Sequence, residues 1–132
     1  MTDARSVVAY ILSRAGCIHP FRLSRILALA ELRALEKMGR RLTDLRYEAG
    51  PGAFYIVGFK EDIVEKDQCF HKREGDPSTG RKGCLEYLCE PPEIPEDVRS
   101  LIDEVLAETE GVDDFQLNNI VINNKLFKKL IE

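Results

Sequence analysis

The sequence lacks the features that mark membrane-spanning and secreted proteins. None of its apolar runs approaches the roughly 18 residues that cross a bilayer. Residues 1–5 lack the basic and apolar regions of a secretory signal. We therefore expect an intracellular, cytoplasmic protein without a membrane partner, in a compartment where thiols usually stay reduced.

Familiar catalytic motifs are also missing. The chain has no phosphate-binding loop of the Walker type, no nucleophile elbow and no helical metalloprotease motif. A Cys84 nucleophile beside His71 is conceivable, but no orienting group or donor for developing charge accompanies the pair. We therefore expect a protein that is not an enzyme.

Positive charge is in short supply. The 132 residues contain 19 Lys and Arg against 23 Asp and Glu, which gives a formal net charge of −4. Nonspecific attraction to nucleic acid depends on neutralising phosphates with Lys and Arg, so this balance makes nucleic acid a weak partner. It favours a protein partner or a second copy of the chain.

The spacing of apolar residues predicts one domain over residues 1–132, with a mainly helical α+β fold. Helical spacing covers residues 3–15 and then residues 20–38, where the second helix is apolar on several sides. An amphipathic helix ends at Gly111, and a shorter one begins near Asp113. Helices therefore occupy both ends of the predicted domain.

Residues 53–65 are compatible with two structures. Tyr55, Phe59 and Ile63 recur every four residues, which favours a helix, whereas the β-rich run 54–57 is typical of a buried strand. We prefer the helix. It gives three N-terminal helices ahead of a β-hairpin, the order of elements in a winged helix.

Residues 69–89 predict that hairpin. Two short runs with alternating faces flank a loop of Gly, Asp, Pro and Ser, which are the residues that favour turns. With the turn centred near Pro77 and Ser78, His71 lies opposite Cys84, and Cys69 lies one side-chain repeat away on the same face.

The hairpin carries a set of potential zinc ligands: Cys69, His71, Cys84 and Cys89. Thiolates and a neutral imidazole suit tetrahedral zinc, so these residues are candidates for one structural zinc ion. A disulfide among the cysteines and unlinked structural thiols are equally consistent with the spacing, and the sequence leaves all three open. We interpret Cys17 as a buried thiol beside a helix-capping His19.

Four cations flank the hairpin loop: Lys72, Arg73, Arg81 and Lys82. They would contact a nucleic-acid backbone in our alternative function, a winged-helix DNA-binding transcriptional regulator with residues 51–65 as its recognition helix. That segment carries Lys60 against three acidic residues, which opposes docking on DNA. A solvated hairpin tip is the simpler interpretation of the four cations.

An apolar stripe lies near the C-terminal end: Leu126, Phe127, Leu130 and Ile131. Such a stripe either docks on the core of a small domain or meets another chain. We take it as the candidate partner-binding surface, and the sequence leaves core docking open.

Four short segments follow one another along the chain: residues 7–12, residues 23–27, Gly50 with Pro51, and residues 114–121. In this order they resemble the Panacea domain family, which is found in antitoxins and proteolysis-linked adaptor proteins. The resemblance implies a small noncatalytic protein-binding, adaptor or antitoxin-like function. The cysteine-bearing hairpin is not part of the family's pattern.

Overall fold

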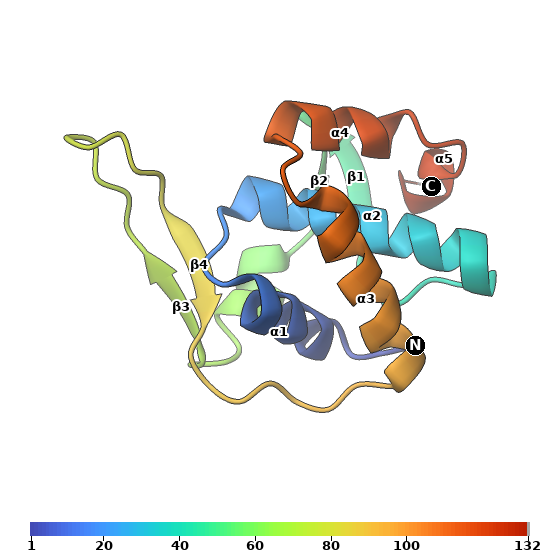
Figure 1. The fold of residues 1–132 in the computed structure, drawn as a ribbon, viewed down its shortest axis with the longest axis horizontal. Coiled ribbons are helices and arrows are strands. Elements are labelled where there is room, and N and C mark those ends of the chain that lie inside the picture. Colours follow the sequence, from blue (N-terminus) through green and yellow to red (C-terminus); the bar gives the residue numbers. More distant parts are fainter. Residues whose placement is uncertain (132) are drawn as a thin grey trace.

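The second helix, α2 (Pro20–Met38), forms the centre of the protein. The structure is a computed structural model that describes residues 1–131, and in it α2 runs through a helical body from which one hairpin projects (Figure 1). Leu23, Leu27, Leu29 and Leu32 on different sides of α2 are almost fully buried. The expectation of a core helix that is apolar on several sides is confirmed.

Local sequence sets both ends of α2. Pro20 occupies the first turn, where its missing N–H costs no hydrogen bond. The His19 Nδ1 accepts a hydrogen bond from the Phe21 amide at 3.1 Å, so the expected helix-capping histidine is present. At the other end Gly39 adopts a left-handed conformation with φ 69°, which glycine reaches without steric cost.

A buried carboxylate holds the chain after α2. Glu31 is 1% exposed, and it accepts hydrogen bonds from the amides of Leu42 and Thr43 and from the Thr43 hydroxyl. Arg41 supplies the counter-charge at 2.6 Å. Because every one of these donors comes from the connecting loop, Glu31 fixes the loop against the helix.

The remaining helices surround α2. They are α1 (Ala4–Ala15), α3 (Glu96–Thr109), α4 (Asp114–Ile122) and α5 (Phe127–Ile131), and each of α3, α4 and α5 packs on α2. Ion pairs join α2 and the residue after its C-cap to the acidic α3: Arg33 with Glu108, Lys37 with Glu104, and Arg40 with Asp97. No helix within residues 1–131 is long and apolar enough to cross a membrane.

The segment after Gly50 differs from the preferred prediction. Strands β1 (Tyr47–Gly50) and β2 (Ala53–Ile56) form an antiparallel hairpin, and only a five-residue π-helix, η1 (Lys60–Val64), follows. Tyr47, Phe54 and Ile56 are buried while Ala53 and Tyr55 are exposed, so the burial period of β2 is two. Pairing with β1 makes residues 53–56 a strand, in spite of the four-residue repeat of apolar side chains that favours a helix.

A second hairpin joins β3 (Phe70–Arg73) to β4 (Cys84–Tyr87). The expected mainly helical α+β fold is therefore confirmed, and so is the hairpin within residues 69–89. The third N-terminal helix is shorter than expected, and a strand precedes it.

Candidate functional site

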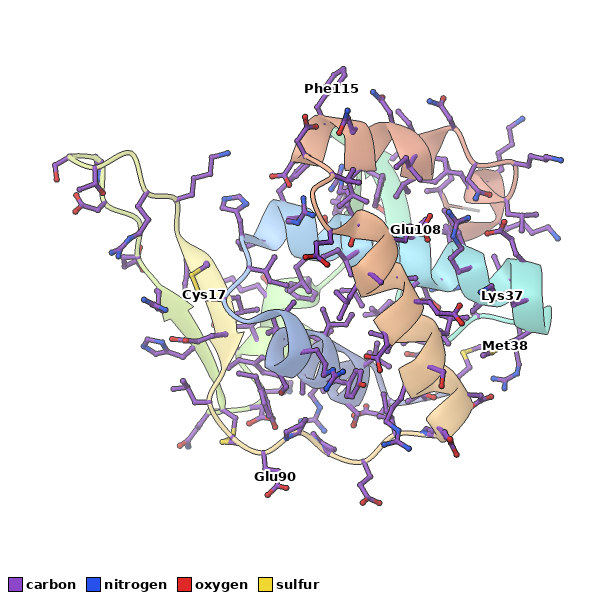
Figure 2. The ribbon with its side chains drawn as sticks, in the orientation of Figure 1. Cys17, Lys37, Met38, Glu90, Glu108 and Phe115 are labelled. Atoms are coloured by element: carbon purple, nitrogen blue, oxygen red, sulfur yellow. A yellow bond between two sulfur atoms is a disulfide. The ribbon has the colours of Figure 1, made fainter. Side chains whose placement is uncertain are left out.

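The four cysteines form two disulfides. Cys17 is bonded to Cys84 and Cys69 to Cys89, with a Cα–Cα distance of 5.4 Å in each pair (Figure 2). The zinc prediction is wrong, because cysteines joined in disulfides have no thiolates to ligate a metal. No group of three metal-ligating side chains is found within residues 1–131.

The hairpin register also separates the expected zinc ligands. His71 lies opposite Glu86, and Arg73 lies opposite Cys84, so the turn is centred one residue later than expected. The His71 Nδ1 is 2.9 Å from a Glu86 carboxylate oxygen, which gives the imidazole an acidic partner in place of a metal. The second oxygen of Glu86 lies 3.7 Å from Arg73.

The two disulfides lie at the two ends of the β3–β4 strand pair, which forms the base of the projecting loop. Cys17–Cys84 ties β4 to the connection between α1 and α2, and Cys69–Cys89 closes the open end of the two strands. Ile18 and Leu85 exchange two backbone hydrogen bonds of 2.9 and 2.7 Å beside the first disulfide. The base is therefore fixed to the helical body by covalent and backbone bonds, while the loop projects away from it (Figure 1).

The projecting loop is ordered by its own polar groups. Asp76 accepts hydrogen bonds from the Ser78 hydroxyl and amide, and these bonds hold the pKa of the Asp76 carboxyl below its ordinary value. Asp76 and Arg81 also form a backbone bridge. A Cβ on Gly75 would meet the Arg81 carbonyl oxygen at 2.7 Å, so the two loop strands approach closely only because glycine is there.

The four hairpin cations are divided between two faces. Arg73, Arg81 and Lys82 line a cavity of about 270 Å³ together with His19, Glu74 and the Cys17–Cys84 disulfide. Lys72 is exposed and is absent from this lining, because neighbouring residues of a strand point to opposite faces. The sequence indicated the cations, but it gave no signal that His19 and Cys17 would lie beside them.

Residues 51–65 do not form the recognition helix of the winged-helix alternative. They contain β2 and the short η1, so this segment has no helix long enough to lie in the major groove in the way the winged-helix alternative requires. Any contact with nucleic acid would rest on the hairpin cations alone.

The C-terminal stripe packs on the helical body. Leu130 is 3% exposed, and Leu126, Phe127 and Ile131 are partly buried against the core. The rings of Phe127 and Phe54 meet edge to face with centroids 5.3 Å apart. The sequence left two roles open for this stripe, docking on the core and binding a partner, and these contacts correspond to docking on the core.

A buried arginine in α2 joins three segments of the chain. Arg25 is 3% exposed, and its guanidinium lies 4.0 Å from the ring centroids of both Phe21 and Phe54. It donates hydrogen bonds to the carbonyls of Gly52 and Phe54 and to the Asn118 side chain. Burial lowers the pKa of the guanidinium, which has no carboxylate within 4.0 Å in residues 1–131.

The surface above Arg25 carries no charge, and we call it the uncharged face. It consists of the β1–β2 turn and the outer side of α4: Gly50, Pro51, Gly52, Ala53, Phe115, Gln116, Asn119 and Ile120. Residues 49–59 and 115–124 contain no Asp, Glu, Lys or Arg, although such residues make up 32% of the chain. Phe115 is 76% exposed and points away from the body (Figure 2).

A cavity of about 690 Å³ lies between α1, the start of α2 and α3. Both arginines of its lining are already paired, because Arg14 lies 3.4 Å from Asp103 and Arg22 bonds Asp114 at 2.9 Å. Arg22 also donates to the carbonyls of Thr109 and Val112. These contacts give Arg22 a role in fixing the turn between α3 and α4.

Searches for similar proteins return no match: no family model, no curated protein and no solved structure is similar to this chain.

Proposed function

We propose that the chain is a small noncatalytic binding protein, adaptor-like or antitoxin-like, whose partner is another protein or a second copy of itself. The observation that carries this proposal is the exposed Phe115 on the uncharged face. Aromatic residues are enriched and charged residues are depleted at the centres of protein–protein interfaces. Nucleic-acid interfaces have the opposite character, because they are strongly positive.

The rigidity of α4 supports the same proposal. Asp113 and Gln116 form a capping box at its start, and Leu117 and Val121 on its inner side are fully buried. Phe115 lies one turn before Asn118, which Arg25 holds from below. An anchor on a helix that is already fixed loses little conformational entropy on binding, so more of its buried area contributes to affinity.

The Panacea-like resemblance remains part of this proposal, and one feature supports it. Residues 23–27 and residues 114–121 are far apart in sequence, yet Arg25 joins them through Asn118, and it also bonds the carbonyl of Gly52, the residue after Pro51. We also propose a cytoplasmic location. With two disulfides, that location requires a cell interior that does not keep protein thiols reduced.

Photo-crosslinking of the full chain in its own cells tests the proposal. A benzophenone amino acid replaces Phe115 in one variant and Leu88 in another, since Leu88 is 63% exposed and lies at the end of the β3–β4 hairpin. We expect a defined protein adduct, or a self-adduct, only from position 115. We also expect Ile120→Ser to reduce its yield at least about tenfold, a change of about 1.4 kcal/mol.

Equal adduct patterns from positions 115 and 88 would contradict the proposed surface. Sedimentation of the purified chain distinguishes the two kinds of partner. A dimer that Phe115→Ser dissociates and Leu88→Ser leaves intact identifies a second copy, whereas a monomer that still gives the adduct identifies another protein.

A nucleic-acid-binding regulator is the second candidate, and the projecting hairpin with Lys72, Arg73, Arg81 and Lys82 favours it. If it is correct, replacing these four residues by Gln abolishes DNA binding and flattens its salt dependence, because they release the counterions. The matched control replaces four exposed lysines elsewhere: Lys66, Lys125, Lys128 and Lys129. If both variants lost DNA binding equally, the binding would depend on the net charge of the protein and not on the four hairpin cations.

A further inference from the structure

The cavity beside the Cys17–Cys84 disulfide is built from two distant parts of the chain. His19 and Cys17 come from the connection between α1 and α2, and the other lining residues come from the hairpin. The disulfide and the Ile18 to Leu85 backbone bonds hold the two parts together. Their relative position is therefore fixed before any ligand arrives.

The charges that line this cavity are unbalanced. Arg73, Arg81 and Lys82 face a single carboxylate, Glu74. Within residues 1–131 neither Arg81 nor Lys82 has a carboxylate within 4.0 Å, in contrast to Arg33 and other cations of α2. Arg73 has only a distant one, Glu86 at 3.7 Å.

His19 adds a neutral donor to the same lining. Its Nδ1 accepts the hydrogen bond of the Phe21 amide, so the neutral ring carries its proton on Nε2. Nε2–H is therefore a donor without protonation of the ring. Gly83 and the disulfide complete the lining without a charged group.

We propose that this cavity binds a phosphate group, either as inorganic phosphate or as a small phosphate monoester. The lining contains two arginines, a residue type whose guanidinium N–H donors match phosphate oxygens in pairs, and Lys82 adds a third positive charge. A volume of about 270 Å³ lies near the lower end of the roughly 300–1,000 Å³ typical of small-molecule pockets. It therefore fits a phosphate with a small substituent better than a nucleotide.

The hairpin supplies its own control for this site. Lys72 has the same charge as Lys82 and is adjacent to Arg73, but it is not part of the cavity. A site that binds phosphate depends on Arg73, Arg81 and Lys82 and tolerates the loss of Lys72. Attraction to net charge alone would depend on all four cations equally.

Titration of the isotope-labelled, oxidised full chain with inorganic phosphate and with glycerol 3-phosphate, followed by NMR at constant ionic strength, tests the site. We expect saturable shifts of the His19, Gly83 and Cys84 amides, with chloride giving none. The double variant Arg81→Gln with Lys82→Gln should bind at least about tenfold more weakly. Lys72→Gln should change the affinity less than about twofold, because Lys72 is not part of the cavity lining and solvent screens its charge.

Each arm of this titration has a defined meaning. Tighter binding of glycerol 3-phosphate than of inorganic phosphate identifies a monoester ligand, and the reverse identifies the free ion. Shifts that do not saturate, equal losses from Lys72→Gln and from the double variant, or binding of a short oligonucleotide without binding of either phosphate would overturn the proposal.

Discussion

Replacing Arg25 by Met should destabilise the protein more than the loss of any surface cation. Arg25 makes hydrogen bonds to the carbonyls of Gly52 and Phe54, at 2.6 and 3.1 Å, and to Asn118 at 2.9 Å. Met has a similar length and fills the space between the Phe21 and Phe54 rings, so the substitution removes the hydrogen bonds and leaves little cavity.

The magnitude follows from the groups left behind. Each buried acceptor without a donor costs about 1–3 kcal/mol, and each lost cation–aromatic contact costs about 0.5–2 kcal/mol. The variant also escapes the cost of burying a cation, which offsets part of the loss. We therefore expect the free energy of unfolding to fall by about 3 kcal/mol, with Arg25→Lys intermediate, since one ammonium cannot reach all three acceptors.

Urea denaturation with the disulfides intact, followed by circular dichroism, measures this difference. The matched control is Arg40→Met just after the end of the same helix, where a 55% exposed side chain lies 3.3 Å from Asp97. An exposed ion pair of this kind contributes less than about 1 kcal/mol. If Arg25→Met and Arg40→Met lowered the unfolding free energy equally, the assignment of Arg25 as the link between α2, α4 and the β1–β2 turn would be refuted.

Three further predictions concern the cross-links, the ion pairs and the C-terminus. Cys17→Ser and Cys84→Ser should each lower the free energy of unfolding by about 4 kcal/mol, the loop-closure value for 67 residues. In calorimetry the double variant should be little less stable than either single variant, because both substitutions remove the same disulfide. The Arg33 hydrogen bond lowers the pKa of Glu108, so the stability that this ion pair contributes is lost as the pH falls below 4.5. Glu108→Gln should therefore make the melting temperature fall less steeply with acid than in the wild type, and an unchanged slope would contradict this prediction. Truncation after Asn124 should cost about 3–5 kcal/mol because it removes the buried part of α5, whereas a fully stable truncated protein that no longer self-associates would make the stripe an interface.

Local patterns in the sequence predicted much of the helical body. The apolar residues of α2 are spread around the helix, and Pro20, His19 and Gly39 mark its ends within one turn, so its position follows from nearby residues. The same holds for α4, whose capping box of Asp113 and Gln116 is visible in the sequence.

Pairing between distant residues was harder to predict. Cys17 is 67 residues from its partner Cys84, and nothing in the local pattern distinguishes this pair from the other possible pairs of four cysteines. Strand β2 depends on β1, whose four residues are too few to show a sustained period in the sequence. The phosphate cavity needs His19 and Arg81 together, so it follows from the disulfide and from no local signal.

Mapping the disulfides of the native protein tests the central claim most directly, which is that one cross-link ties the hairpin to the helical body and a second closes the open end of the hairpin. The protein is alkylated without reductant, digested, and analysed by mass spectrometry before and after reduction, alongside elemental analysis for zinc. We predict linked peptides that join Cys17 to Cys84 and Cys69 to Cys89, no alkylated thiol and no zinc. Alkylation of Cys17, a linked Cys69 to Cys84 peptide, or about one zinc per chain would contradict the account.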